Sequence, residues 1–459
     1  MPGVAAIYGD RACDANAVIT NMLRALSHRG NKVKIKSSND RSGVGYASNG
    51  LPGGFFESKL STVVLDGLFF SRTLRGQTQM ALEESSRDFT SIMNIPGAFA
   101  EISYRPDKLT VVRDPNGLRP LYYSAQKGVI AIASERKALW YIGHTKTERI
   151  LPGYFYEAHS QGMSKKSLFR FPRPRPQPMT MEYSASRLKR LLQRSITSIT
   201  ANLDRVAVAF SGGLDSAITA LLAKQANVEV ELVSTGIRDS TELRTVEKYA
   251  KALDLPISIE AYDADSLESY IRRIIWLIEE HDLMRVGIAI PLHWAALLAA
   301  RRGHSVMLCG QGSDELYGGY YRYSRILDNE GRRALLSALY RGIVEAPRVN
   351  YERDEQATCS TGVELRTPFT NLDVIDFSLR IPLEFKVRAG NDLMRKWVLR
   401  AAALKAGLPG EIVWRRKKAI QHGTGVEKTI LRLARKQKIS TQEYLARVSR
   451  EIVRQAEIP

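Results

Sequence analysis

Phe210–Ser216 (FSGGLDS) directly follows the apolar run Val206–Ala209, and the next residues, Ala217–Gln225, carry apolar side chains with helical spacing. The small and β-branched residues of the run alternate, which predicts a short buried strand. The loop therefore lies between the end of a strand and the first turn of a helix. Free backbone N–H groups and the helix dipole converge at such a junction and favour a bound anion. The stretch thus predicts an α/β domain with an anion site at the carboxyl edge of its sheet.

The composition of this loop indicates which anion it binds. Gly212 and Gly213 let the backbone approach a phosphate closely, whereas Asp215 would repel phosphates unless a Mg²⁺ ion lies between them. The loop lacks the Lys of a Walker A loop, and it resembles the pyrophosphate-binding loop of enzymes that split ATP into AMP and pyrophosphate. A plain Gly-rich turn is the alternative. If the loop is a pyrophosphate-binding loop, contacts with ATP are expected from Ser211, Gly212, Gly213, Leu214, Asp215 and Ser216.

A second loop of similar chemistry, Gly310–Tyr320 (GQGSDELYGGY), follows the predicted strand Ser305–Cys309. Its glycines again permit a close approach of the backbone to a ligand, and Asp314 is available as a Mg²⁺ ligand. Because the carboxyl ends of parallel strands meet at one edge, Asp215 and Asp314 can hold one metal ion against a triphosphate.

Two further segments combine charge with tight turns. Gly362–Phe369 (GVELRTPF) holds Glu364 and Arg366 before a Pro turn, and Arg415–Gly425 (RRKKAIQHGTG) places four cations before a glycine turn. Such cations can neutralise the charge that develops on a leaving pyrophosphate. On its own, the basic segment is also typical of a solvated surface.

Together and in this order, the four segments resemble the synthetase domain of asparagine synthetase and of its relatives, the β-lactam and carbapenam synthetases, from Val206 to Gly425. The resemblance implies ATP as substrate and Mg²⁺ held by Asp215 and Asp314. It also implies that Lys417 stabilises the transition state of adenylation. In that family a substrate carboxylate attacks the α-phosphorus of ATP, an acyl-adenylate forms with release of pyrophosphate, and an amine displaces AMP.

The same resemblance assigns further residues. It implies catalytic roles for Lys417, Glu364 and Gln311, and a nucleotide site that includes Thr235, Gly236, Gly310, Gly312 and Ser313. Arg353, Asp354, Glu364 and Arg366 match positions near the acceptor side. Gln311 departs from the family, which has Glu or Tyr at this position, so a general base is not expected there. Asn371 also departs, since an Asp often follows the Pro-Phe turn.

The N-terminal part resembles the class II glutamine amidotransferase domain, but its catalytic residues are changed. In that family a Cys follows the initiator Met, and its thiol attacks glutamine while its α-amine acts as the base. Here the position is Pro2, and Asp66-Gly67-Leu68 replaces the Asn-Gly-Glu of the oxyanion segment. Cys13 lies too far along the chain to substitute. We expect a structural domain. The resemblance rests on residues 1–9, 27–30, 113–123 and 134–139.

These patterns predict two domains joined by a linker. Residues 1–165 contain short alternating runs such as Thr62–Leu65 and Leu109–Val112, and the resemblance implies an α/β/β/α sandwich of the Ntn-hydrolase type. A Pro- and Arg-rich linker spans 166–184. From 185 to 459 we predict a doubly wound parallel α/β sheet with added helices, with strands at 228–233 and 305–309, a helix at 242–253 and helices beyond Leu327.

Length, charge and cysteine content limit the classes of protein further. The chain has 459 residues, enough for two cores, and 44% of them are hydrophobic. The longest apolar region, Val286–Ala300, is shorter than the about 20 residues of a membrane span, so we predict a buried helix. Three widely spaced cysteines and no apparent signal peptide indicate the cytoplasm. The net charge of +19 is spread along the chain, so we expect small-molecule partners rather than nucleic acid or membrane, with a homodimer left open.

Four functions follow from these features. The leading hypothesis is an ATP-dependent amide-forming ligase, an asparagine synthetase that uses aspartate and ammonia rather than glutamine. The second is a related synthetase that adenylates another carboxylate, which Gln311 and the altered first domain leave open. The third is a tRNA-modifying ATP pyrophosphatase, and the fourth is a non-catalytic nucleotide-binding protein.

Overall fold

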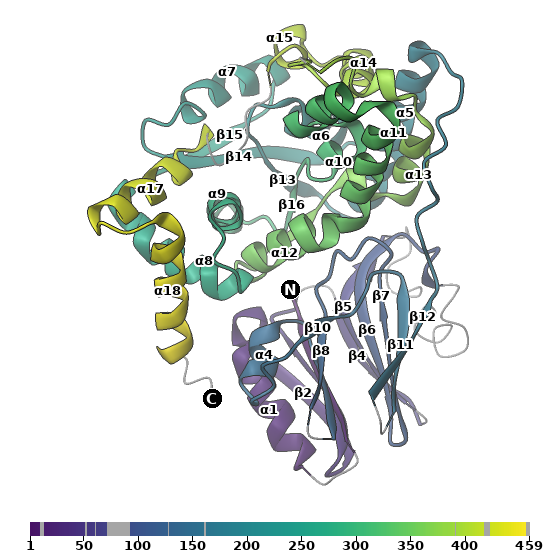
Figure 1. Cartoon of the computed structure of the whole chain (residues 1–459), viewed down its shortest axis with the longest axis vertical. Helices are drawn as coiled ribbons and strands as arrows, with labels where there is room; N and C mark the ends of the chain where they lie inside the picture. Colours follow the sequence, from purple (N-terminus) through teal and green to yellow (C-terminus); the bar gives the residue numbers. More distant parts are fainter. Residues whose placement is uncertain are drawn as a thin grey trace.

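The computed structural model describes residues 1–9, 13–50, 53–59, 61–70, 92–126, 128–159, 162–390, 392–416 and 423–455. A β-rich part and an α/β part lie against each other, with the N-terminal strands in purple and blue and the α/β part in teal to yellow (Figure 1).

In the described residues, the N-terminal part consists of two stacked antiparallel sheets of six strands each. Alternate residues of β1 (Gly3–Gly9) serve the two faces of its sheet, as the period of a strand requires. Val4 and Ala6 pack between the sheets, whereas Ala5 and Ile7 pack beneath helix α1 (Ala15–Ala25). The strand order in the first sheet is β10 (Glu148–Arg149), β8 (Tyr122–Gln126), β9 (Val129–Ala133), β1, β3 (Ser42–Ser48), β2 (Lys32–Asn39). The strand order in the second sheet is β12 (Gly162–Ser167), β11 (Tyr154–His159), β7 (Lys108–Arg113), β6 (Gly97–Arg105), β5 (Thr62–Phe69), β4 (Gly53–Glu57).

The predicted strands at Thr62–Leu65 and Leu109–Val112 are confirmed as parts of β5 and β7. Helices α1 and α4 (Arg136–Trp140) cover the first sheet, which accounts for three layers of the predicted sandwich. A helical layer on the second sheet is not found among the described residues. Residues 71–91, which separate β5 from β6, lie outside them.

An extended segment without helix or strand connects the two parts, between the end of β12 at Ser167 and the start of α5 at Met181. Two of its backbone N–H groups donate to the end of α13 (Leu372–Arg380), from Arg175 to Leu379 at 3.2 Å and from Gln177 to Arg380 at 2.8 Å. The proline-rich composition therefore corresponds to a connection that lies along the second part. The domain boundaries remain a prediction.

The second part is built on a five-stranded parallel sheet in the order β15-β14-β13-β16-β17, with helices on both faces. β13 (Arg205–Ala209) lies in the middle, and its side chains alternate between the faces. Val206 and Val208 pack with α5 (Met181–Ile199) and α6 (Leu214–Lys224), whereas Ala207 packs with α9 (Leu283–Arg301). The doubly wound sheet is thus confirmed. The other strands are β14 (Glu229–Ile237), β15 (Ile257–Tyr262), β16 (Val306–Leu308) and β17 (Glu364–Arg366).

Two sequence expectations for this part need correction. Residues 364–366 lie in a stretch expected to be helical, but they form β17, which extends the sheet beside β16. Three residues are too short for a periodic signal to appear. The loop after β13 is also shorter than expected, because Leu214, Asp215 and Ser216 already belong to the first turn of α6.

Helix α9 contains the apolar region at 286–300, and its burial agrees with the predicted core helix. By length and mean hydropathy, 1.6, it is the one helix in the described ranges that could cross a membrane. However, 67% of that window is buried inside the protein, as expected of a core helix.

The remaining helices are α7 (Leu243–Leu253), α8 (Leu267–Ile278), α10 (Ser313–Tyr317), α11 (Tyr321–Ala346), α12 (Glu352–Cys359), α13, α14 (Trp397–Ala406), α15 (Gly410–Val413), α17 (Val426–Lys436) and α18 (Thr441–Gln455). Some of these helices pack on the sheet and others, such as α17 and α18, pack on helices α8 and α9.

Candidate active site

The loop between β13 and α6 is shaped to present backbone N–H groups. Gly212 has a positive φ of +65°, and a Cβ there would lie 2.8 Å from the Tyr249 ring, so only glycine fits. The Ser216 hydroxyl donates to the carbonyl of Gly213 at 3.1 Å, which fixes the turn. Among the residues that the structure describes, no side chain caps the N-terminus of α6. Its first N–H groups are therefore available to an anion.

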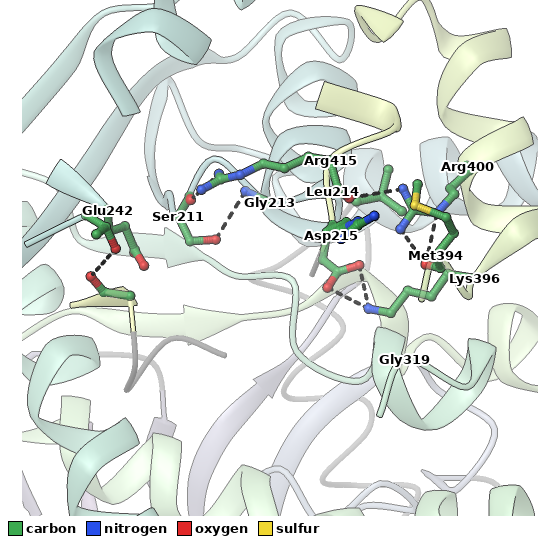
Figure 2. Close-up of a pocket in the computed structure, with 13 residues that line it drawn as sticks. Ser211, Gly213, Leu214, Asp215, Glu242, Gly319, Met394, Lys396, Arg400 and Arg415 are labelled. Carbon is green, nitrogen blue, oxygen red and sulfur yellow. Dashed lines mark hydrogen bonds and ion pairs between the residues drawn. The ribbon is translucent and has the colours of Figure 1, made fainter. Parts of the chain in front are cut away.

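A pocket with about 690 Å³ of empty volume opens beside this loop (Figure 2). Four cationic and two acidic side chains line it, which suits a ligand that carries several negative charges together with a metal ion. The charged residues are Lys396, Arg400, Arg415, Arg416, Asp215 and Glu242. Arg415 is fixed against the loop, since its Nη1 donates to the carbonyl of Ser211 at 3.1 Å.

Lys396 joins the two loops that the sequence singled out. Its Nζ lies 2.7 Å from Oδ2 of Asp215 and 2.5 Å from Oδ1 of Asp314. It also donates to the Ser313 hydroxyl at 2.9 Å. Burial opposes its charge, but Asp215 and Asp314 nevertheless raise the pKa of Lys396. Strand ends about a hundred residues apart in the chain thus converge on one cation, as the parallel sheet predicts.

Lys396 lies in none of the four sequence motifs, so no motif pointed to it. The residue sits just before α14, and both Lys396 (φ 53°) and Arg395 (φ 48°) have left-handed backbone. Two successive residues of this kind are strained, which is common where a side chain must be held in place for function. No local pattern of hydrophobicity or turn residues indicates this conformation.

The donor set between the two loops fits a divalent cation. Asp215 and Asp314 supply carboxylate oxygens that already share one ammonium group, and oxygen ligands are those that Mg²⁺ prefers. The backbone leaves no spare room here. A Cβ at Gly319 would lie 1.8 Å from Oδ1 of Asp314, and one at Gly310 would lie 2.6 Å from Cβ of Asp215. The Lys396 ammonium holds the position between the carboxylates that a metal ion would share.

Several residues predicted to contact the nucleotide lie at the strand ends but do not line this pocket. The Thr235 hydroxyl is buried and donates to the carbonyl of Pro291 at 3.1 Å. Gly236 lies beneath Thr424, whose carbonyl would be 3.3 Å from an added Cβ. Gly312 begins α10 with a φ of +94°. The structure therefore brings together the residues of loop 211–216, Ser313 and Asp314, while the adenosine contacts stay a prediction.

Lys417 and the residues up to His422 lie outside the described part of the chain. The residues on either side, Arg416 and Gly423, both line the pocket.

A second, smaller cavity of about 360 Å³ lies between the two parts of the protein. Gln311 lines it and donates through Nε2 to Oδ2 of Asp354 at 2.8 Å, while Arg353 holds the other oxygen of Asp354 at 2.8 Å. Arg119 contributes to the same wall from the N-terminal part. Gln311 and Asp354, assigned to the acceptor side by resemblance, are therefore neighbours.

Glu364 is fully buried and its two oxygens are held by arginines. Arg366 donates to one at 2.7 Å, and Arg119 donates to the other at 2.8 Å. Burial would raise the pKa of Glu364, but Arg366 and Arg119 together hold it below its ordinary value. Both oxygens of Glu364 therefore have arginine partners in this structure, and the catalytic role that the resemblance implies stays a prediction.

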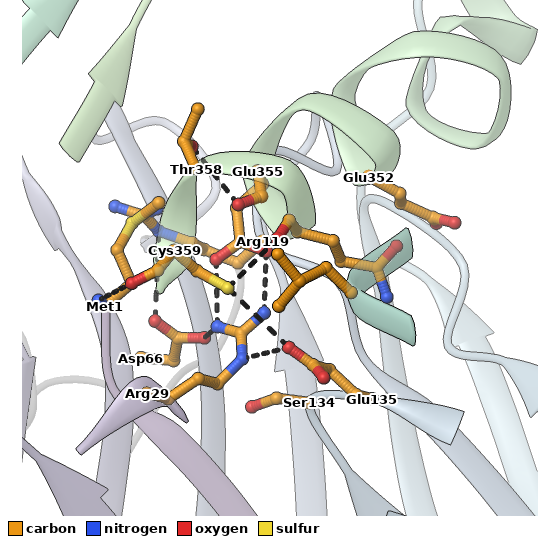
Figure 3. Close-up of polar contacts among 12 residues, drawn as sticks. Met1, Arg29, Asp66, Arg119, Ser134, Glu135, Glu352, Glu355, Thr358 and Cys359 are labelled. Carbon is orange, nitrogen blue, oxygen red and sulfur yellow. Dashed lines mark hydrogen bonds and ion pairs between the residues drawn. The ribbon is translucent and has the colours of Figure 1, made fainter. Parts of the chain in front are cut away.

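Ion pairs occupy the region where the amidotransferase resemblance would place glutamine chemistry (Figure 3). Asp66 is buried, 3.6 Å from Arg29 and 3.9 Å from Arg119, and burial raises its pKa to about 6. Arg29 in turn binds both oxygens of Glu355, at 2.8 and 2.7 Å, across the boundary between the two parts. Its Nη1 also donates to the carbonyl of Pro2 at 3.1 Å. These residues serve the contact between the two parts.

Known proteins resemble this chain over both parts. The asparagine synthase family matches residues 187–356 and 327–457, and a glutamine amidotransferase domain family matches residues 81–189. A Methanocaldococcus jannaschii protein described as an asparagine synthetase (glutamine-hydrolyzing) is 31% identical over an alignment of 409 residues, and the match covers 78% of this chain and 74% of the relative. Asparagine synthetase B (glutamine-hydrolyzing) of Escherichia coli is 25% identical over 358 residues, 75% of this chain and 63% of its own length. Asparagine synthetase (glutamine-hydrolyzing) 1 of Arabidopsis thaliana is 24% identical over 358 residues, and the match covers 75% of this chain and 60% of the relative.

Proposed function

We propose that this chain, which belongs to the asparagine synthetase family of carbon–nitrogen ligases, forms asparagine from aspartate, ammonia and ATP. The observation that carries the proposal is the convergence of Asp215 and Asp314 on Lys396, beside the uncapped N-terminus of α6. This arrangement has the charges needed to bind a nucleoside triphosphate with a divalent cation.

The proposed reaction has two halves. ATP binds with its phosphates at the α6 N-terminus, and Asp215 and Asp314 would hold Mg²⁺, which supplies charge neutralisation when it is bound. The β-carboxylate of aspartate attacks the α-phosphorus, the bond to the β-phosphate oxygen breaks, and pyrophosphate leaves. Ammonia then attacks the acyl carbon, loses a proton and displaces AMP.

The pocket's cations serve the first half. Lys396, Arg400 and Arg415 surround the place where negative charge gathers on the leaving pyrophosphate. Cations that are already held in position stabilise this charge well, because they do not have to move when it develops. Lys417, which the family resemblance makes a catalytic residue, is proposed to add to them.

Ammonia is proposed as the nitrogen source, although the relatives are named for hydrolysing glutamine. Pro2 has no thiol, and Leu68 is a buried apolar side chain at the position of the family's carboxylate. Asp66 is enclosed by Arg29 and Arg119. These features support a domain that holds the fold together and performs no glutamine chemistry.

One observation favours a second candidate, a related synthetase that adenylates another carboxylate. Gln311 stands beside Asp354 in the cavity between the two parts, where the relatives carry Glu or Tyr by the resemblance. A neutral amide binds an incoming amine differently from a carboxylate or a phenol. The acceptor half could therefore serve different substrates.

Pyrophosphate release tests the proposal. The full chain with MgATP, aspartate and ammonium should release pyrophosphate and form asparagine in equal amounts, and glutamine should not replace ammonium. Asp215→Asn and Asp314→Asn should each abolish release, whereas Glu260→Gln, a change of the same kind outside the pocket, should not. Release with another carboxylate but none with aspartate would favour the second candidate. Glutamate production from glutamine would refute the proposed nitrogen source.

A further inference from the structure

Glu242 is an acidic residue of the pocket that the proposed reaction does not use. It precedes α7, and only 8% of its surface is exposed. Its backbone N–H donates to the carbonyl of Gly423 at 3.2 Å, and a Cβ at Gly423 would lie 2.3 Å from Oε2. The carboxyl group is thus packed tightly on one side and lines the pocket on the other. Among the described residues it has no hydrogen-bond or ion-pair partner.

A buried carboxyl group without a partner stays protonated more readily than one in water. Burial raises the pKa of Glu242 to about 8, and the charge of Arg415 only partly offsets this. In the described part of the chain, the pocket beside Glu242 is lined by Arg415 and Arg416 on the segment after α15, by Thr241 on its own loop, and by Gly423 before α17. At neutral pH the pocket therefore contains an uncharged acid that carries a proton to donate.

The position of Glu242 indicates which ligand group accepts a hydrogen bond from its protonated carboxyl group. In the view of Figure 2, the loop residues Ser211 and Gly213 lie between Glu242 and Asp215. All four line the pocket that is also lined by Lys396, Arg400 and Arg415. A ligand that satisfies these cations carries phosphate oxygens, which accept hydrogen bonds and repel carboxylates.

We propose that Glu242 binds the polyphosphate of the nucleotide as an uncharged hydrogen-bond donor. This inference rests on the proposed function, because it takes the ligand of the pocket to be ATP. It assigns Glu242 a direct contact with the ligand, distinct from the metal-binding role of Asp215 and Asp314. It also explains why a carboxyl group is tolerated among phosphates, since the protonated group has no charge to repel them.

Binding of MgATP and of inorganic pyrophosphate with Mg²⁺ to the full chain, measured by titration calorimetry from pH 7 to 9, tests the inference. Glu242→Gln keeps an uncharged donor and should bind both ligands within about threefold of the unaltered protein at pH 7. Glu242→Ala should weaken both about tenfold or more, as expected for a lost hydrogen bond to a charged group. Above pH 8 the unaltered protein should lose affinity relative to Glu242→Gln, because only its carboxyl group ionises.

Matched controls and contrary outcomes keep the two proposals separate. Glu260→Gln changes an acid that pairs with Arg301 outside the pocket, and it should leave both affinities unchanged. If Glu242→Gln binds as weakly as Glu242→Ala, an ionised carboxylate is needed and the inference is wrong. Weaker binding of MgATP but not of pyrophosphate would place Glu242 against the nucleoside and also overturn it. If the unaltered protein binds no MgATP, the proposed function itself fails.

Discussion

Replacing Lys396 by Met should destabilise the protein and make its stability depend on Mg²⁺. The substitution keeps most of the side-chain volume but removes the ammonium group between Asp215 and Asp314. Two carboxylates would then face each other without a cation. A divalent ion that binds both should relieve this repulsion, so the variant reports directly on the proposed metal position.

The contact distances set the magnitude. At 2.7 Å and an effective dielectric constant of about 20, one ammonium–carboxylate pair is worth about 6 kcal/mol before desolvation is subtracted. Removal of one partner of a buried pair typically costs about 3–5 kcal/mol. Because the side chains of Asp215 and Asp314 stay 25% and 17% exposed, we expect the lower end, about 3 kcal/mol. At about 2 °C per kcal/mol for a domain of this size, the Tm should fall by about 6 °C.

Thermal unfolding with and without Mg²⁺ measures the effect. Mg²⁺ at a hundred times its Kd stabilises a single site by about 2.7 kcal/mol, so it should restore most of the Tm of Lys396→Met. Lys405→Met, within the helix α14 that Lys396 precedes, is the matched control. Lys405 makes a pair with Glu182 that is exposed, so its loss should change the Tm little.

Two results would contradict this reasoning. Lys396→Met could be as stable as Lys405→Met, which would mean that the two carboxylates are well solvated without the ammonium group. Alternatively, Mg²⁺ could raise the Tm of the unaltered protein and of Lys396→Met equally. The ion would then bind elsewhere, and Asp215 and Asp314 would not form its site.

Three further outcomes are expected. Arg29→Met should lower the free energy of unfolding by about 3–5 kcal/mol in a denaturant titration, because Glu355 loses its bidentate partner; an unchanged midpoint would show that the pair is dispensable. Pro2→Cys should release no glutamate from glutamine in a coupled assay, and robust hydrolysis would show that Asp66 and Leu68 do not lie at the old glutamine site. Asp66 has a pKa raised to about 6, so its folded state binds a proton that the unfolded state has lost, and stability should fall as the pH rises from about 4 to 6. Asp66→Asn should therefore gain Tm relative to the unaltered protein at pH 7 but not at pH 4, and the opposite order would mean that Arg29 and Arg119 hold the carboxylate ionised.

The sequence by itself determined the framework of the site. The alternation in Val206–Ala209 and the helical spacing after Leu214 place the loop at a strand end, because the periods of strand and helix are local properties of the backbone. The chemistry of Asp215 and Asp314 was equally readable, since parallel strands bring their carboxyl ends to one edge. The family of the chain also followed from motifs whose residues lie next to one another in sequence.

Only the tertiary structure showed which distant side chains complete that framework. Lys396 reaches the two carboxylates through a left-handed turn before α14, and Glu242 is a buried acid against which Gly423 packs closely. The sequence shows Glu364 only as an acidic residue. The structure shows that Arg119, from the other part of the chain, donates a hydrogen bond to one of its oxygens. Patterns of apolar residues that lie close together in the sequence reflect the local period of a strand or a helix. Burial and pairing of charges depend on which segments fold against each other, and this decides both the pKa of a side chain and its role.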